Sequence, residues 1–109
     1  KSEIIIADHL RRYGVVYKYE KPLELTVHGR RVTFYPDFTD MNSRTGRIYY
    51  LEHFGMMDNE DYYNAVLRKL DAFEMNQLLI GRDVLLLHES SSAPLNTRVL
   101  DCYIQEYLV

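Results

Sequence analysis

The sequence predicts an α/β protein, of the α+β kind, in which helices flank a central mixed sheet of about four to five strands. Two observations lead to this expectation. Short β-branched, aromatic or alternating runs are interleaved with longer segments of helical periodicity. One long helical segment separates two strand-like runs and has the length of a right-handed crossover, so those two strands should be parallel. The expected order is α-β-β-β-α-β-α.

The N-terminal part of the chain predicts a helix followed by a hairpin. Ser2 is a favourable N-cap, Glu3 suits the positive start of a helix, and Gly14 suits the position after its end. Apolar and polar residues then alternate on both sides of the turn His28-Gly29-Arg30, which predicts two antiparallel strands. The expected ranges are a helix at about 2–13, a strand-like entry at 15–19, and hairpin strands at 23–27 and 32–37.

The remaining elements follow a polar segment, residues 40–46, whose turn-forming chemistry predicts a connection. Asp58 or Asn59 can cap a long helix, and Gly81 lies beyond its end. Residues 84–88 are mostly apolar, as expected for a strand covered on both faces. The expected ranges are a strand at 48–54, a helix from 58 or 59 to about 79, a strand at 84–88 and a helix at about 96–108.

The composition is that of an ordinary folded protein. The 109 residues suffice for one domain, expected to span residues 1–109, and 47% of them are apolar. The absence of a starting Met suggests a fragment of a longer chain, whose other domains would be partners. No apolar run approaches the roughly 20 residues that cross a bilayer, so no membrane partner is expected. The lone Cys102 suits a reducing compartment, and without a secretion signal a cytoplasmic location is expected.

The formal net charge of −3 restricts the class of function. A domain that holds nucleic acid mainly by neutralising phosphates is usually basic, so a high-affinity, stand-alone binder is disfavoured. A metal-dependent enzyme is not disfavoured, because an acidic metal site lowers the net charge and the bound cation restores it. A domain whose partner module holds the nucleic acid also remains open.

Two carboxylates are the strongest candidates for chemistry. Asp37 ends one predicted strand and Glu52 lies in the next, so a hairpin-like pairing would bring their side chains together near one end of the sheet. Such carboxylates repel each other unless a cation, a proton or a basic side chain lies between them. Mg²⁺, or Mn²⁺, is a natural occupant because it prefers oxygen ligands. The alternative interpretation is that both carboxylates are solvated or satisfied by backbone N–H groups.

The order of elements, with a Pro-Asp pair on the second hairpin strand and an acid on the third strand, resembles the PD-(D/E)XK, or restriction-endonuclease-like, nuclease superfamily. The likeness spans nearly the whole chain, and the segment Glu52-His53-Phe54-Gly55 also resembles nuclease-like segments attached to some bacterial helicases. The segments that carry it are Tyr19-Glu20-Lys21-Pro22-Leu23, Tyr35-Pro36-Asp37-Phe38 and Tyr50-Leu51-Glu52-His53-Phe54-Gly55.

The resemblance implies roles for four acidic residues. Asp37 matches the metal-binding Asp of the superfamily and Glu52 matches its second acidic ligand. Glu3 matches the acid that some members place on the first helix, and Glu20 is a rival for that third carboxylate. The metal implied is Mg²⁺ or Mn²⁺.

One position departs from the superfamily. Its third strand carries an acid, any residue and then Lys, but here Phe54 stands two residues after Glu52. His53 should point to the opposite face of the strand, which favours a supporting role over direct replacement of the lysine. Lys69, at the edge of the apolar stripe of the long helix, is the main candidate for the missing cation, and Lys21 is the other. Alternatively, Lys69 only covers the core with its stem.

Aromatic and basic residues supply candidate contacts to nucleic acid. Most of the tyrosines are expected in the core, with Tyr35 and Tyr62 bordering the site, where an aromatic ring can stack on an unpaired base. Arg44 and Arg47 lie on the connection between the two acidic strands and are candidates to touch phosphates. The alternative is a solvated loop.

The sequence therefore predicts a metal-dependent nuclease, a Mg²⁺-dependent phosphodiester hydrolase whose partner is nucleic acid, with DNA preferred. One alternative is a catalytically inactive nuclease-fold domain that binds nucleic acid or protein within a larger protein, since Phe54 replaces the expected lysine. Another is a structural or protein-interaction module in which the carboxylates are merely solvated.

Overall fold

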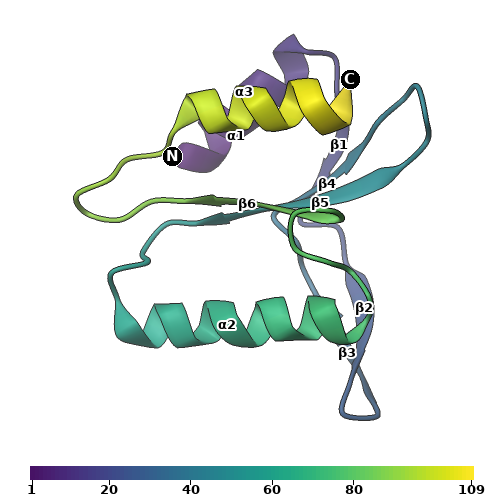
Figure 1. The fold of residues 1–109 in the computed structure, drawn as a ribbon, viewed down its shortest axis with the longest axis vertical. Helices are drawn as coiled ribbons and strands as arrows, with labels where there is room; N and C mark the ends of the chain where they lie inside the picture. Colours follow the sequence, from purple (N-terminus) through teal and green to yellow (C-terminus); the bar gives the residue numbers. More distant parts are fainter.

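A four-stranded sheet, a separate two-stranded hairpin and three helices make up the structure, a computed structural model that describes all residues from 1 to 109 (Figure 1). The mixed α/β architecture confirms the expected fold class. The elements are α1 (Ser2–Arg12), β1 (Val16–Tyr19), β2 (Leu23–Val27), β3 (Arg30–Phe34), β4 (Phe38–Met41), β5 (Ile48–Phe54), α2 (Glu60–Met75), β6 (Val84–His88), α3 (Thr97–Tyr103) and a closing π-helical turn, η1 (Ile104–Leu108).

The main sheet has the strand order β1-β4-β5-β6. β1 pairs with β4 and β4 with β5 in the antiparallel sense, whereas β5 and β6 are parallel. The parallel pair flanks α2, so α2 is the crossover that its length predicted. β2 and β3 pair only with each other and form the separate hairpin.

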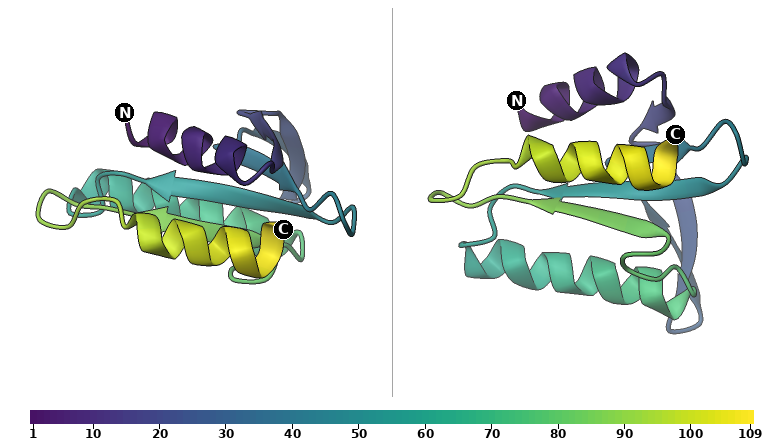
Figure 2. Two further views of the ribbon diagram at one scale, coloured as in Figure 1. Left: turned by 90° about the horizontal axis from the view of Figure 1, so that it is seen from above. Right: turned by 45° about the horizontal axis from the view of Figure 1, so that its top comes forward.

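Helices cover both faces of the main sheet. α1 and α3 lie on one face and α2 on the other, with the β2–β3 hairpin reaching past the C-terminal end of α2 (Figures 1 and 2). Side chains of β5 alternate between these layers: Tyr49 and Leu51 belong to the core under α1 and α3, and Tyr50 packs in the core under α2. Glu52, two residues after Tyr50, therefore faces α2.

The main difference from the predicted elements is β4. The hairpin strand was expected to reach residue 37 and the polar connection to begin at residue 40, but the chain leaves the hairpin at Phe34 and enters a strand of the main sheet at Phe38. Pro36 has no N–H to give a ladder, which favours a break here. Phe38 is fully buried and makes edge-on contacts with Tyr17 and Tyr19, which fixes the following strand in the sheet.

Two helix ends also differ from the expectation. Asn59 caps α2 as predicted, but the helix stops at Met75, where Asn76 donates to the carbonyls of Ala72 and Thr26 and Gln77 adopts a φ of 59°. Ser2 was expected to cap α1, yet Lys1 holds that position and makes no side-chain cap. The Ser2 hydroxyl instead bonds a distant carboxylate. No helix combines the length and apolar character needed to cross a bilayer.

Candidate nuclease-like site

A cavity of about 200 Å³ lies between β5 and α2. Three of the predicted residues, Asp37, Glu52 and Lys69, meet there, although they come from a turn, a strand and a helix. The lining residues are Asp37, Glu52, His53, Phe54, Tyr62, Ala65, Val66 and Lys69. The structure therefore gathers a basic and two acidic side chains in one hollow.

Glu52 is the most buried charged group of the cavity. It is 0% exposed, its Oε1 accepts a hydrogen bond of 2.8 Å from Lys69 Nζ, and its Oε2 has no partner. Burial raises the pKa of Glu52 to about 7, although the charge and hydrogen bond of Lys69 act in the opposite direction. Glu52 Oε2 is therefore a buried acceptor whose hydrogen-bonding capacity is unsatisfied.

Asp37 is held in the turn between β3 and β4. Its Oδ2 accepts a 2.7 Å hydrogen bond from the backbone N–H of His53, and its own N–H lies 3.4 Å from Glu52 Oε1. Burial raises the pKa of Asp37, while the His53 N–H and the charge of Lys69 lower it. The two carboxyl groups are thus linked through the backbone of β5.

Lys69 supplies the cation that β5 lacks. Its Nζ reaches Glu52 and also lies 3.4 Å from the carbonyl oxygen of Tyr35. Phe54, two residues after Glu52 on β5, contributes an apolar wall to the cavity. Lys21, the alternative candidate, is exposed and makes no hydrogen bond or ion pair in the structure. The geometry therefore favours Lys69 over Lys21 as the cation of this cavity.

His53 points away from Glu52, as the alternation of a strand requires. Its Nε2 lies 2.6 Å from Glu89 Oε1, and the Ser2 hydroxyl donates to the same oxygen at 2.6 Å. These hydrogen bonds, that of Ser2 first, lower the pKa of Glu89. We call this set, Ser2, His53 and Glu89, the strand-end clamp. Sequence reasoning missed Glu89, because its partners are far away along the chain and no local pattern signals them.

Glu3 and Glu20 do not line the cavity. Glu3 Oε1 accepts from the Tyr19 hydroxyl at 2.8 Å, beside β1, although its charge is near enough to raise the pKa of Asp37. Glu20 is exposed, and its backbone N–H donates to the Asp37 carbonyl. Neither side chain joins the two carboxylates as a third acid in this structure.

The four residues predicted to contact nucleic acid do not lie together in the structure. Tyr62 lines the cavity, but its hydroxyl accepts from the Gly55 N–H at 3.0 Å, and Tyr35 lines a neighbouring groove. Arg44 and Arg47 lie at the opposite end of the β4–β5 pair from Asp37 and Glu52, so they do not border this cavity. Arg44 bonds the Val109 carbonyl, and Arg47 pairs with Asp83 and covers Tyr49.

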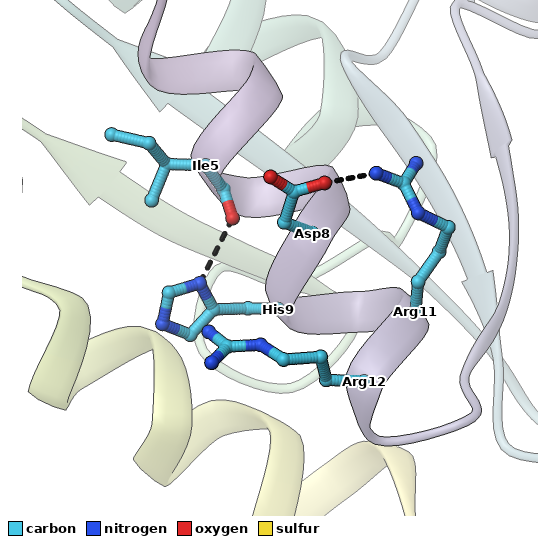
Figure 3. Close-up of a pocket in the computed structure, with 5 residues that line it drawn as sticks. All are labelled: Ile5, Asp8, His9, Arg11 and Arg12. Atoms are coloured by element: carbon cyan, nitrogen blue, oxygen red, sulfur yellow. Dashed lines mark hydrogen bonds and ion pairs between the residues drawn. The ribbon is translucent and has the colours of Figure 1, made fainter.

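A further hollow lies on α1 (Figure 3), on the opposite side of the sheet from α2 (Figure 1). Arg11 pairs with Asp8, and His9 Nδ1 lies 2.9 Å from the Ile5 carbonyl. Arg12 extends beside His9 (Figure 3). The polar groups are largely satisfied within one helix, so this hollow offers no reactive centre.

Asp37 and Glu52 are the side chains of the cavity between β5 and α2 that could hold a hard divalent cation. Mg²⁺ is commonly held by one or two carboxylates and keeps waters that a substrate phosphate can replace. Asp37 and Glu52 supply two carboxylates, and Glu52 Oε2 is buried without a partner. No group of three or more acidic, His or Cys side chains in the chain is arranged to hold a metal ion, so water or substrate would have to complete any coordination by Asp37 and Glu52.

Comparisons of the chain with protein-family models, curated proteins and solved structures found no match. What the chain does must therefore be inferred from the cavity itself.

Proposed function

We propose that the chain is a metal-dependent nuclease domain of the PD-(D/E)XK, restriction-endonuclease-like class, which hydrolyses phosphodiester bonds of nucleic acid, with DNA as the expected substrate. The observation that carries this proposal is the contact of 2.8 Å between Lys69 Nζ and Glu52 Oε1, in the cavity that Asp37 also lines. This contact brings the lysine of α2 into the cavity, where the resemblance would place a lysine on the strand and this chain has Phe54.

The arrangement of elements supports the same class. A helix precedes an antiparallel strand pair, and a crossover helix leads to a parallel strand. Asp37 enters from the turn before β4 and Glu52 from β5, and these are the two acids that the resemblance matches to metal ligands.

The residues of the chain have distinct tasks in this proposal. Asp37 and Glu52 would hold the cation, which when bound polarises a phosphoryl oxygen and lowers the pKa of a water. The His53 N–H orients the Asp37 carboxylate, and the Lys69 ammonium stabilises negative charge at the attacked phosphate. Phe54 and Val66 keep bulk water from the rear of the cavity.

A cleavage assay tests the proposal. The 109-residue chain is incubated with end-labelled DNA in Mg²⁺, in Mn²⁺ and in EDTA, and products are resolved by length. Cleavage should require the metal and should fall to background in Asp37→Ala, while Glu74→Ala, at an exposed carboxylate of α2, should cleave like the parent. Equal cleavage by Asp37→Ala and the parent would rule out this cavity.

One observation favours the alternative of an inactive nuclease fold: Lys69 already neutralises Glu52, so this pair could be purely structural. Calorimetry with Mn²⁺ separates the two functions. Heat of binding that is lost in Asp37→Ala supports the nuclease. Absence of ion binding in a chain that still binds DNA supports the inactive fold.

A further inference from the structure

A groove of about 620 Å³ runs between the β2–β3 hairpin and α2. Val27, Val32 and Phe34 form the hairpin wall. On α2 the corresponding wall has Ala65 and Ala72, seven residues apart and therefore on one stripe, whose small side chains leave the space open. We call this hollow the α2–hairpin groove.

Two cations lie on the same stripe of α2. Arg68 and Lys69 are the only charged residues that line the groove, and no acidic residue lines it. Arg68 is exposed, and its guanidinium makes no hydrogen bond or ion pair in the structure. A groove with apolar walls, an unpaired guanidinium and no acidic lining residue is complementary to an anion that also carries apolar surface.

An aromatic side chain stands at the same groove. Tyr35 is 55% exposed, and its hydroxyl makes no hydrogen bond in the structure. It lies between β3 and Asp37, and its carbonyl oxygen faces Lys69 Nζ. A large ring left exposed in this way has no role in the core.

The groove and the candidate nuclease cavity are adjacent. Ala65 and Lys69 line both hollows. Tyr35 is two residues from Asp37 in the chain, so a ligand that covers the Tyr35 ring would extend directly toward the two carboxylates. The groove is therefore positioned as an approach to the cavity.

We propose that a single strand of nucleic acid binds in the α2–hairpin groove, with a base stacked on Tyr35 and a backbone phosphate paired with Arg68, and passes from there to the Asp37–Glu52 cavity. The inference rests on the proposed nuclease function, which makes this strand the substrate.

The apolar walls favour an unpaired strand over a duplex. In a duplex the faces of the bases are hidden by stacking, and mainly the phosphates and base edges are accessible. Unpaired bases expose faces that stack on aromatic rings, at about 1–3 kcal/mol per base. Guanidinium groups pair with phosphate in a bidentate manner, which suits Arg68.

Fluorescence anisotropy in EDTA tests the inference, because binding is then measured without metal or cleavage. The probes are a short labelled oligodeoxynucleotide and the duplex of the same sequence. The parent should bind the single strand more tightly than the duplex. Tyr35→Ala should weaken single-strand binding on the order of 5- to 100-fold, as expected for loss of one stacked base, whereas Tyr35→Phe should bind like the parent.

Charge variants give a second readout. Arg68→Ala should lower the slope of log affinity against log salt by about 0.7, the value for one phosphate contact to a single strand. Arg68→Glu should weaken binding further. The matched control is Arg12→Glu, an equal charge change at an exposed arginine on α1, across the sheet, and it should change affinity much less.

Three results would overturn the inference: tighter binding of the duplex, equal effects of Arg68→Glu and Arg12→Glu, or an unchanged affinity in Tyr35→Ala. Failure of the nuclease proposal appears differently. A chain that binds single strands through Tyr35 and Arg68 but never cleaves them keeps the groove and loses the catalytic role. Metal-dependent cleavage that does not depend on Tyr35 or Arg68 would support the nuclease function and contradict strand binding in the groove.

Discussion

At the scale of single residues, the Glu52–Lys69 contact links stability and proposed function. Glu52 is fully buried, and a buried charge is costly unless a partner neutralises it. Lys69 is that partner, and its side chain retains 23% exposure beside the cavity. The same ammonium group can therefore stabilise Glu52 and serve a phosphate.

Removing Lys69 should reveal both roles. In Lys69→Met the carboxyl of Glu52 stays buried without a partner, so the free energy of unfolding should fall by about 3–5 kcal/mol. The double variant Glu52→Gln/Lys69→Met should recover most of that loss in urea denaturation but should not cleave DNA. Lys18→Met, at an exposed lysine, is the control. A single variant as stable as the parent would contradict the structural role of the pair.

Asp40 gives a prediction about pH. It is fully buried under α1 and α3 with neither oxygen bonded, and burial raises its pKa from 3.8 to about 7. The folded state then holds this proton more tightly than the unfolded state, so stability should fall as pH rises from about 4 to about 7. Asp40→Asn should flatten this loss, which amounts to a few kcal/mol. Urea denaturation at several pH values measures it, with Asp71→Asn as the control.

If Asp40→Asn and the parent lose stability in parallel across that pH range, the buried carboxyl is not the cause.

The sequence could reveal some of these residues and not others. The proximity of Asp37 and Glu52 could be anticipated, because a turn-rich connection between strands predicts antiparallel neighbours. The placement of Lys69 could be inferred from its position on the helical wheel. The burial of Asp40 could not be predicted, since an acid at the start of a polar segment indicates exposure. Only strand β4, which the sequence pattern does not reveal, turns its side chain inward.

At the scale of elements, long-range contacts position the site. The strand-end clamp ties the start of α1 and the end of β6 to β5, where the His53 N–H holds Asp37. The β5–β6 crossover could be predicted from the length of α2 alone. The clamp and the separation of the hairpin from the main sheet depend on packing between distant segments, so no local pattern reveals them.

Glu89→Ala should loosen the clamp. It removes a charge-assisted contact between His53 and Glu89 and the bond from Ser2, so the free energy of unfolding should fall by about 1.5–3 kcal/mol at neutral pH. Because the pKa of Glu89 is lowered, the difference between the variants should shrink as pH falls below 4.5. Hydrogen exchange should become faster in the first turn of α1.

Glu74→Ala is the matched control for this change. Unaltered exchange in α1, together with unchanged stability, would mean that the clamp has no positioning role.

At the scale of the whole molecule, charge and shape act together. Cationic side chains are spread over both helical layers and the net charge is −3, so the chain lacks a broad basic surface. The α2–hairpin groove is a local exception. An enzyme with such a surface would rely on the groove, on a bound cation or on other domains to hold its substrate.

The affinity of the isolated chain should therefore be low. At physiological salt, Kd for DNA without metal should be about 10⁻⁴–10⁻⁶ M, the range of non-specific binding. Anisotropy titration measures it. Nanomolar binding by the 109 residues alone would contradict this account of the charge distribution.

Diffraction from crystals soaked in Mn²⁺, with anomalous data recorded, tests the central claim most directly. The account predicts one strong peak in the cavity between β5 and α2, bound by carboxylate oxygens of both Asp37 and Glu52 at about 2.1–2.2 Å. A cavity without a peak at saturating Mn²⁺, with Lys69 still bonded to Glu52, would contradict it.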